Sequence, residues 1–251
     1  MYKISVLFSL CILLIFACEK EEPVIQTEFL GPKISIGNGQ AWTFVQTDEQ
    51  QEPISIGIQF DESALENLPS GSTHADEFML ALPDEIQVAP YNHVTLDWNE
   101  HGHEPMHVYD LPHFDMHFYF MSEDQRNQIG PFDSIAFNKP LPAEYLAPAY
   151  LETPGGVPRM GAHIIDLMSP EVAGTGIFTH TFIYGKYDAR INFLEPMVTK
   201  DFLDSKMNMT QAIRQPAQWQ RAGYYPESYL IEYDAAAAIY TISLYNLQKV
   251  D

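Results

Sequence analysis

Histidine and carboxylate side chains are concentrated in one stretch of the chain, residues 97–120. Five of the nine histidines lie there beside five acidic residues. Neutral imidazole and carboxylate are the ligands that zinc and similar divalent ions commonly take in proteins. The stretch is therefore typical of a metal site or of a pocket that handles protons. Its histidines are His101, His103, His107, His113 and His117, and its carboxylates are Asp97, Glu100, Glu104, Asp110 and Asp115.

The spacing of His113, Asp115 and His117 indicates which of these side chains can act together. They belong to an aromatic run, from His113 to Phe120, that follows Pro112 and predicts a β-strand. Side chains two residues apart share a face of a strand at roughly 7 Å, whereas those four apart are separated by about 13 Å. Asp115 is therefore expected to share an ion with only one of the two histidines unless the strand bends. The other ligands must come from elsewhere in the chain.

Two distant segments supply candidates for those ligands, His163 and Glu195. Three histidines with carboxylates suit zinc as the first expectation, and iron, manganese, nickel and copper remain open. The neighbours of the ligands are expected to hold the imidazole rings by hydrogen bonds. The predicted ligands of a divalent metal are His113, Asp115, His117, His163 and Glu195, and the predicted neighbours are Asp97, His101, His103 and Asp110.

The same residues support other hypotheses about function. In one, the histidines form a hydrogen-bonded network that fixes loops without any metal, as in an envelope-stress interaction protein or a ligand-binding protein. In another, the chain is a metal-dependent enzyme that acts on a small molecule, with Glu104 or Asp166 as general base. Nearby methionines suggest copper as an alternative metal, because copper binds thioether and imidazole ligands. Strand alternation, however, places Met116 on the face opposite Asp115, which favours packing in the core. The sequence contains no Gly-x-Ser-x-Gly motif.

Residues 1–17 have the composition of a signal peptide, with Lys3 before an apolar run. The sequence Ile15-Phe16-Ala17-Cys18 resembles a bacterial lipobox, which implies cleavage before Cys18 and acylation of its thiol. Residues 18–30 are polar and acidic and are predicted to form a tether. We therefore expect an exported lipoprotein of the Gram-negative outer membrane, anchored in the membrane through acylated Cys18 and facing either the periplasm or the cell surface.

The acidic balance of the chain limits its partners. Asp and Glu number 34 against 13 Lys and Arg, for a net charge of −21. Nucleic acids and anionic lipids bind basic patches, so neither is an expected partner, whereas a small-molecule ligand is. Cys11 lies in the signal segment and Cys18 is the predicted anchor, so the mature domain has no thiol for a disulfide or for catalysis. The oligomeric state is left open.

Residues 31–251 are predicted to form a single β-rich domain. The runs at 40–47 and 53–60 flank a polar stretch and predict a hairpin, as do the runs at 176–187 and 189–195. Short strands with turn signals between them predict an antiparallel sandwich or barrel, mainly β, with a few short helices and long ordered loops. Further strands are predicted at 77–82, 93–98, 229–233 and 239–247, and the longest helix at 199–208.

Five motifs resemble those of a family of uncharacterised exported bacterial proteins, and the resemblance covers about residues 35–235. The founding member of that family belongs to an extracytoplasmic sigma/anti-sigma regulon. The resemblance implies a shared β-rich fold and a shared polar pocket, and it implies no established activity. Met116 and Ala162 depart from the larger or aromatic residues expected at their positions. The motifs are WNEHGHEP at 98–105, PHFDMHFY at 112–119, MGAH at 160–163 with Asp166, FIYG at 182–185 and FLEPM at 193–197.

Overall fold

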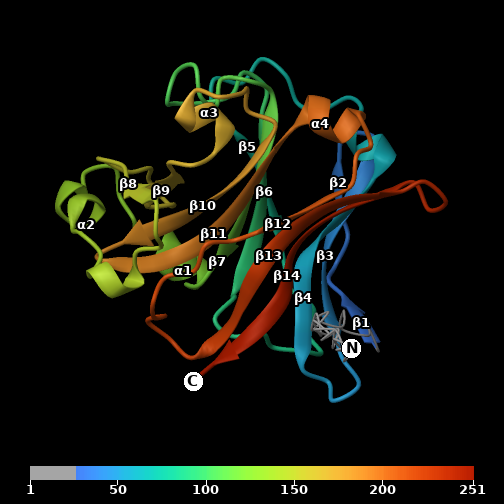
Figure 1. Ribbon diagram of the computed structural model, residues 1–251. Helices are drawn as coiled ribbons and strands as arrows, with labels where there is room; N and C mark the ends of the chain where they lie inside the picture. The colour runs from blue at the N-terminus through green and yellow to red at the C-terminus, as the bar shows by residue number, and fades with distance from the viewer. Residues whose placement is uncertain (1–26) are drawn as a thin grey trace, which may run out of the picture.

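The computed structural model describes residues 27–251. Its strands form two antiparallel sheets that pack face to face, as Figure 1 shows. Because the strands divide into two separate sheets, the predicted sandwich is confirmed over the barrel alternative. The predicted signal segment and Cys18 lie outside the described residues.

The first sheet contains strands from both ends of the described chain, in the order β1-β3-β4-β14-β13-β12, with β2 paired to β3. The predicted hairpin at 40–47 and 53–60 is confirmed by the antiparallel pairing of β3 with β4. The strands of this sheet are β1 (Thr27–Leu30), β2 (Ile34–Ile36), β3 (Gly39–Thr47), β4 (Pro53–Asp61), β12 (Met209–Ala212), β13 (Gly223–Asp234) and β14 (Ile239–Val250).

The second sheet contains the middle of the chain, in the order β5-β6-β7-β11-β10-β9-β8. The second predicted hairpin is confirmed by the pairing of β10 with β11, although β10 begins only at His180 and β11 continues to Thr199. The strands are β5 (Asp76–Leu80), β6 (His93–Asn99), β7 (His113–Tyr119), β8 (Tyr150–Glu152), β9 (Ala162–Asp166), β10 (His180–Tyr187) and β11 (Arg190–Thr199).

The helices of residues 27–251 are short, and none is long and apolar enough to cross a bilayer. The prediction of the longest helix at 199–208 was wrong, because α4 ends at Asp204 and the backbone turns to a positive φ at Lys206. Asp, Ser and Asn in this segment are weak helix formers. The helices are α1 (Glu123–Arg126), α2 (Ser134–Asn138), α3 (Pro170–Ala173) and α4 (Lys200–Asp204), with 3₁₀ turns at Glu62–Leu65 and Ala143–Tyr145.

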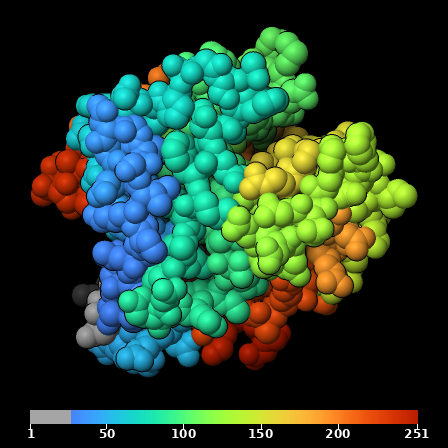
Figure 2. Space-filling model, turned by 180° about the vertical axis from the view of Figure 1, so that it is seen from behind, coloured from blue at the N-terminus to red at the C-terminus, as the bar shows by residue number. Residues whose placement is uncertain are grey.

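The second sheet is buried on both faces, for two different reasons. Alternate side chains of β6 and β7, such as Leu96 and Met116, point into the core between the sheets. They pack there with apolar side chains of the first sheet, such as Ile58 and Leu244. The opposite face carries the histidines and carboxylates, and the loop of residues 100–112 and the segment 120–160, which includes α1, α2 and β8, contribute walls of the cleft over it. Figure 2 shows the second of these segments, coloured lime to yellow, as a bulge on one side of the molecule.

The domain begins earlier than the predicted boundary at residue 31. The last part of the predicted tether, Thr27–Leu30, is strand β1, and its residues pair with Phe44–Thr47 of β3. The polar composition of 18–30 indicated a tether because an edge strand exposes much of its surface, as three of the four β1 side chains do here. The remainder of the predicted tether lies outside the described residues.

Candidate metal centre

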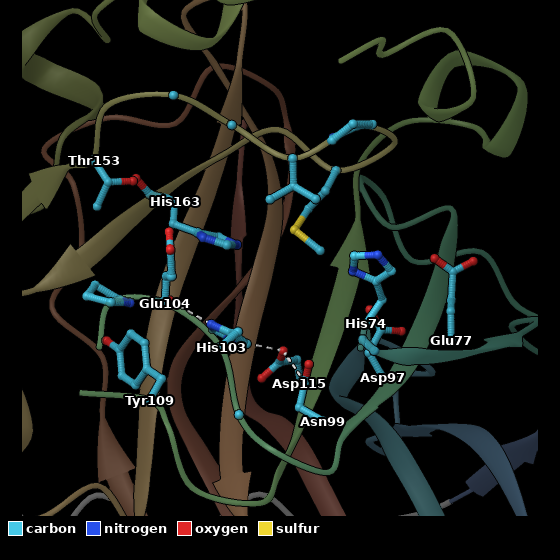
Figure 3. Close-up of a pocket in the computed structure, with 18 of the residues that line it drawn as sticks. His74, Glu77, Asp97, Asn99, His103, Glu104, Tyr109, Asp115, Thr153 and His163 are labelled. Carbon is cyan, nitrogen blue, oxygen red and sulfur yellow. Dashed lines mark hydrogen bonds and ion pairs between the residues drawn. The ribbon is translucent and has the colours of Figure 1, made fainter. Parts of the chain in front are cut away.

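A cleft with a volume of about 990 Å³ opens over the polar face of the second sheet. Loops of residues 72–75, 100–106 and 153–160 contribute most of its walls. Figure 3 shows Asp115 and His163 on either side of His103 within this cleft. The cleft therefore gives access to the region of the sheet where imidazoles and carboxylates gather.

One group of three side chains, the Asp115 triad, consists of His103, His113 and Asp115. The carboxylate of Asp115 lies between the two rings, with Oδ1 3.0 Å from His113 Nε2 and Oδ2 3.2 Å from His103 Nε2. Burial raises the pKa of Asp115, but the charges of His113 and His103 outweigh it and hold that pKa well below its usual range. Burial lowers the pKa of His103, yet Asp115 raises it to about 9.

Backbone carbonyls fix the orientation of both rings in the Asp115 triad. His113 Nδ1 lies 2.6 Å from the carbonyl oxygen of Leu111, and His103 Nδ1 lies 2.7 Å from that of Glu104. The amide of Asn99, at the end of β6, donates to Asp115 Oδ2 at 2.8 Å. Each Nε2 is therefore directed at the carboxylate by a contact on the far side of its ring.

A second group, the Glu195 triad, consists of His117, His163 and Glu195, whose ligand atoms all lie within 4.8 Å of one another. Oε1 of Glu195 is 3.4 Å from His117 Nε2, and Oε2 is 3.7 Å from His163 Nε2. His117 and Glu195 are completely buried. Neither oxygen of Glu195 has a hydrogen-bond partner among residues 27–251.

The buried charges of the Glu195 triad shift the pKa values of its members in opposite directions. Burial raises the pKa of the Glu195 carboxyl. Burial lowers the pKa of His117, but Glu195 and Asp97 outweigh it and raise that pKa to about 9. Burial and the neighbouring charges of His103 and His117 lower the pKa of His163 to about 3. The triad thus combines the neutral imidazole of His163 with a buried ion pair between His117 and Glu195.

Neighbouring strands position the Glu195 triad. On β6, Thr95 Oγ1 and Asp97 Oδ2 lie 3.2 and 3.3 Å from His117 Nδ1. On β9, His163 is aligned with Gly185 of β10. The ring of Phe193 lies over Gly185, where an added Cβ would approach two of its ring carbons to 2.0 Å.

That Phe193 ring also contacts both imidazoles edge-on, with centroids 5.0 Å from His117 and 6.0 Å from His163. Gly185 is therefore required for the packing that holds the two rings of the triad. Without a side chain at that position, the phenyl ring can lie flat on the strand beneath the imidazoles.

One wall of the cleft carries a cationic pair that the sequence analysis missed. Arg126, only 1% exposed, and Arg159 both form ion pairs with Glu77, and all three side chains line the cleft. The guanidinium of Arg126 lies 4.6 Å from the centre of the Tyr119 ring, and its Nη1 has no hydrogen-bond partner in the described part of the chain. Two guanidinium groups share one carboxylate, so this wall has a net positive charge.

The structure brings the five predicted ligands close together but divides them between two triads. His113 and His117 fall into different groups, as their spacing on the strand predicted. His163 and Glu195 converge on His117 from β9 and β11. His103, predicted only as a neighbour, instead belongs to the Asp115 triad.

The other predicted residues divide in the same way. Asp97 lies beside His117 as predicted. The exposed His101 side chain contacts Glu100 at 3.6 Å, and Asp110 accepts a hydrogen bond from the backbone N–H of His107. Neither His101 nor Asp110 therefore holds a triad imidazole.

Of the two candidate bases, Glu104 is exposed and lines the cleft, whereas Asp166 is buried and paired with Arg214. Asp166 lies three residues after His163 on the same strand, so it occupies the opposite face. Asp166 is therefore not among the residues that line the cleft, and strand alternation was a signal for this placement. The same alternation, continued along β6 from Asp97, places Asn99 on the face of the triads and could have identified it as a neighbour of Asp115.

Comparison with known proteins adds little to this geometry. A family model described as "TTHB210-like: Hypothetical protein TTHB210" matches residues 48–98. This match spans β4 to β6 and includes Asp97, but it contains no residue of either triad. No curated protein and no solved structure matches the chain. The chain is thus similar over a minority of its length to a family of hypothetical proteins.

Proposed function

We propose that this protein binds a divalent metal ion, with zinc as the first candidate, at His117, His163 and Glu195. The observation that carries the proposal is the buried carboxylate of Glu195, whose two oxygens face two imidazole nitrogens and lack hydrogen-bond partners within residues 27–251. A buried charge is costly unless it is paired or coordinates a metal. A metal ion among these three groups would bind the carboxylate and both imidazole nitrogens directly.

The orientation of His117 supports a cation in this position. Its Nδ1 faces Asp97, and because an ionised carboxylate can only accept, the ring proton belongs on Nδ1. When a metal ion displaces the second ring proton, Nε2 presents a lone pair on the side of Glu195. Two electron-rich atoms face each other favourably only when a proton or a metal lies between them, and a metal ion also accepts the third donor, His163.

The distances suit a metal ion better than a hydrogen bond. Zinc–nitrogen and zinc–oxygen bonds of about 2.0–2.2 Å in a tetrahedron place neighbouring ligand atoms about 3.4 Å apart. The observed separations are 3.4 Å from His117 Nε2 to Glu195 Oε1 and 3.7 Å from His163 Nε2 to Glu195 Oε2. Hydrogen bonds from nitrogen to oxygen are shorter, most often 2.9–3.0 Å. A network held together by protons alone would be expected to close these gaps.

The test is metal binding by the full chain, purified without a histidine tag and stripped with a chelator. Visible absorption bands of added Co²⁺ report tetrahedral coordination, and elemental analysis after zinc loading gives the stoichiometry. We expect Glu195→Gln and His163→Gln each to bind one equivalent of zinc fewer than the wild type. His180→Gln is the matched control, because His180 lies in the same sheet and contacts Tyr229 outside both triads. Unchanged zinc content in both triad variants would refute the proposal.

A second candidate function, a metal-dependent enzyme acting on a small anionic molecule, is supported by the cleft. Three protein donors leave a tetrahedral ion one position for water or substrate. His163 lines the cleft, whose wall carries the cationic pair Arg126 and Arg159 with Glu77, and Glu104 lies at its edge as a general base. Azide or inorganic phosphate should change the Co²⁺ spectrum if that position opens to the cleft. A spectrum that neither anion alters would contradict this second function.

We also propose that the chain is an exported lipoprotein of a Gram-negative outer membrane. The support is the sequence Ile15-Phe16-Ala17-Cys18 after an apolar run, with an acidic segment behind it. Labelled palmitate should be incorporated into the wild-type protein and not into Cys18→Ala, and membrane fractionation should place the labelled protein in the outer membrane. Equal labelling of both proteins would contradict acylation at this cysteine.

A further inference from the structure

We propose that a second divalent cation binds in the Asp115 triad, coordinated by His103, His113 and Asp115. This site is separate from the ion proposed at His117, His163 and Glu195, and its three donors are different side chains. Imidazole and carboxylate donors define its ligand as a borderline divalent ion such as zinc. The protein would then hold two metal ions beneath one cleft.

The hydrogen bonds on the far side of each ring determine where the lone pairs point. Leu111 and Glu104 offer backbone carbonyl oxygens, which only accept, so Nδ1 of His113 and of His103 must each carry a proton. Once metal coordination displaces any second proton from these rings, both Nε2 atoms present lone pairs. Both are directed at the carboxylate of Asp115, from 3.0 and 3.2 Å.

A proton alone satisfies only part of this arrangement. A proton on His103 Nε2 would be donated to Asp115 Oδ2, with which that nitrogen forms a hydrogen bond. His113 Nε2 and Asp115 Oδ1 nevertheless have no hydrogen-bond partner among residues 27–251, although they lie 3.0 Å apart and His113 is completely buried. A metal ion accepts all three lone pairs at once, because coordination does not require the N–H···O alignment that is missing here.

The two triads cannot share one ion in the observed arrangement. His113 and His117 are four residues apart on the straight strand β7, which separates their attachment points by about 13 Å. Asp115 is aligned with Met197 of β11, two residues from Glu195, so the two carboxylates occupy successive positions of the same face. The rings of His103 and His163, one from each triad, lie nearly parallel with their centroids 6.4 Å apart. Each ion therefore has its own carboxylate.

The Asp115 triad is also the more accessible of the two. His103 comes from a loop, and its side chain is 27% exposed, whereas His117 and Glu195 are closed off within the sheet. Asp115 and His103 both line the cleft. An ion can therefore reach this triad from solvent while the rest of the sheet stays closed.

The stoichiometry of the full chain decides between one ion and two. After zinc loading and removal of free metal, wild-type protein should hold two equivalents. His103→Gln should hold one, with affinity at the affected site reduced more than about 100-fold, since loss of an outer hydrogen-bond partner alone costs 10–100-fold. His101→Gln is the matched control, because this exposed side chain lies two residues away on the same cleft wall and belongs to neither triad.

Combined variants separate this inference from the proposed function. Glu195→Gln should retain one equivalent of zinc, and adding His103→Gln to that variant should remove it. Asp115→Asn should behave as His103→Gln does. One equivalent in the wild type, or two equivalents that survive both His103→Gln and Asp115→Asn, would overturn the second site. If the substitutions impair folding, ¹⁵N chemical shifts of the wild-type imidazoles decide the question. The Nε2 of His103 and of His113 must both move on zinc addition, and shifts confined to His117 and His163 would refute the inference.

Discussion

Replacing Glu195 by glutamine should have opposite effects on stability with and without metal. In the metal-free protein, the carboxyl group is completely buried, and burial raises its pKa. The folded state therefore binds the Glu195 proton more tightly than the unfolded state, so stability is lost as pH rises above the unfolded value of about 4.5. A neutral amide of the same shape removes this loss and can donate to the imidazole nitrogens.

The size of each effect follows from the burial of the group. Burying an ion costs several kcal/mol, and the attraction of His117 and partial protonation offset part of this cost, so Glu195→Gln should stabilise the metal-free protein by about 2 kcal/mol at pH 8. In zinc at 1,000 times the dissociation constant, wild-type protein gains about 4.1 kcal/mol, most of which the variant should lose. The variant should then be the less stable protein by about 2 kcal/mol.

Urea unfolding at pH 8, followed by tryptophan fluorescence in chelator and in zinc, measures both values. The midpoints can be compared directly if the slopes agree. Glu171→Gln is the matched control, because the Glu171 carboxyl is also buried without a hydrogen-bond partner in the described chain and lies outside both triads. Its effect should not depend on zinc. If Glu195→Gln lowers stability equally in chelator and in zinc, Glu195 is a structural group and the reasoning is wrong.

Three further substitutions test the surroundings of the triads. Burial, followed by the charge of Arg126, lowers the pKa of His93 to about 4 from 6.5. Stability should therefore fall by on the order of 2 kcal/mol as pH drops from 6.5 to 4, and urea unfolding of His93→Gln should show no such fall. Gly185→Ala should destabilise by about 1–3 kcal/mol and weaken zinc binding in calorimetry, because the new methyl displaces Phe193. Phe60→Ala, in the core between the sheets, should cost about 3–5 kcal/mol in thermal unfolding with unchanged zinc stoichiometry. The first expectation is contradicted if the stability of His93→Gln depends on pH as that of the wild type does. The second is contradicted if Gly185→Ala binds zinc with full affinity, and the third if folded Phe60→Ala loses metal.

Strand alternation made much of the fold and part of the site predictable. The pattern of β7 placed His113, Asp115 and His117 on one face and Met116 on the other, and the structure confirms both placements. The distance between positions four apart predicted that the two histidines act separately. The prediction that His163 lies close to His117 is also confirmed. These inferences succeeded because they depend on local backbone geometry.

The position of His103 could not be predicted in the same way. Its loop is shaped by tertiary contacts, including a single antiparallel bridge between His103 and Tyr109 and a stacked contact with His163. Neither contact has a periodic signal in the sequence. The cationic pair of Arg126 and Arg159 was missed for a related reason, since Glu77, which joins them, lies far away in the chain.

The bridge between His103 and Tyr109 has a consequence for how fast an ion can be exchanged. The loop that carries His103 leaves the sheet at Asn99 and rejoins it at His113, so its two ends are strand residues that cannot move independently. Release from the Asp115 triad would then proceed by outward rotation of this loop about those two ends. Residence time would follow the rate of that hinge motion rather than the strength of the coordinate bonds, and stiffening the loop would trap the ion without tightening its ligands.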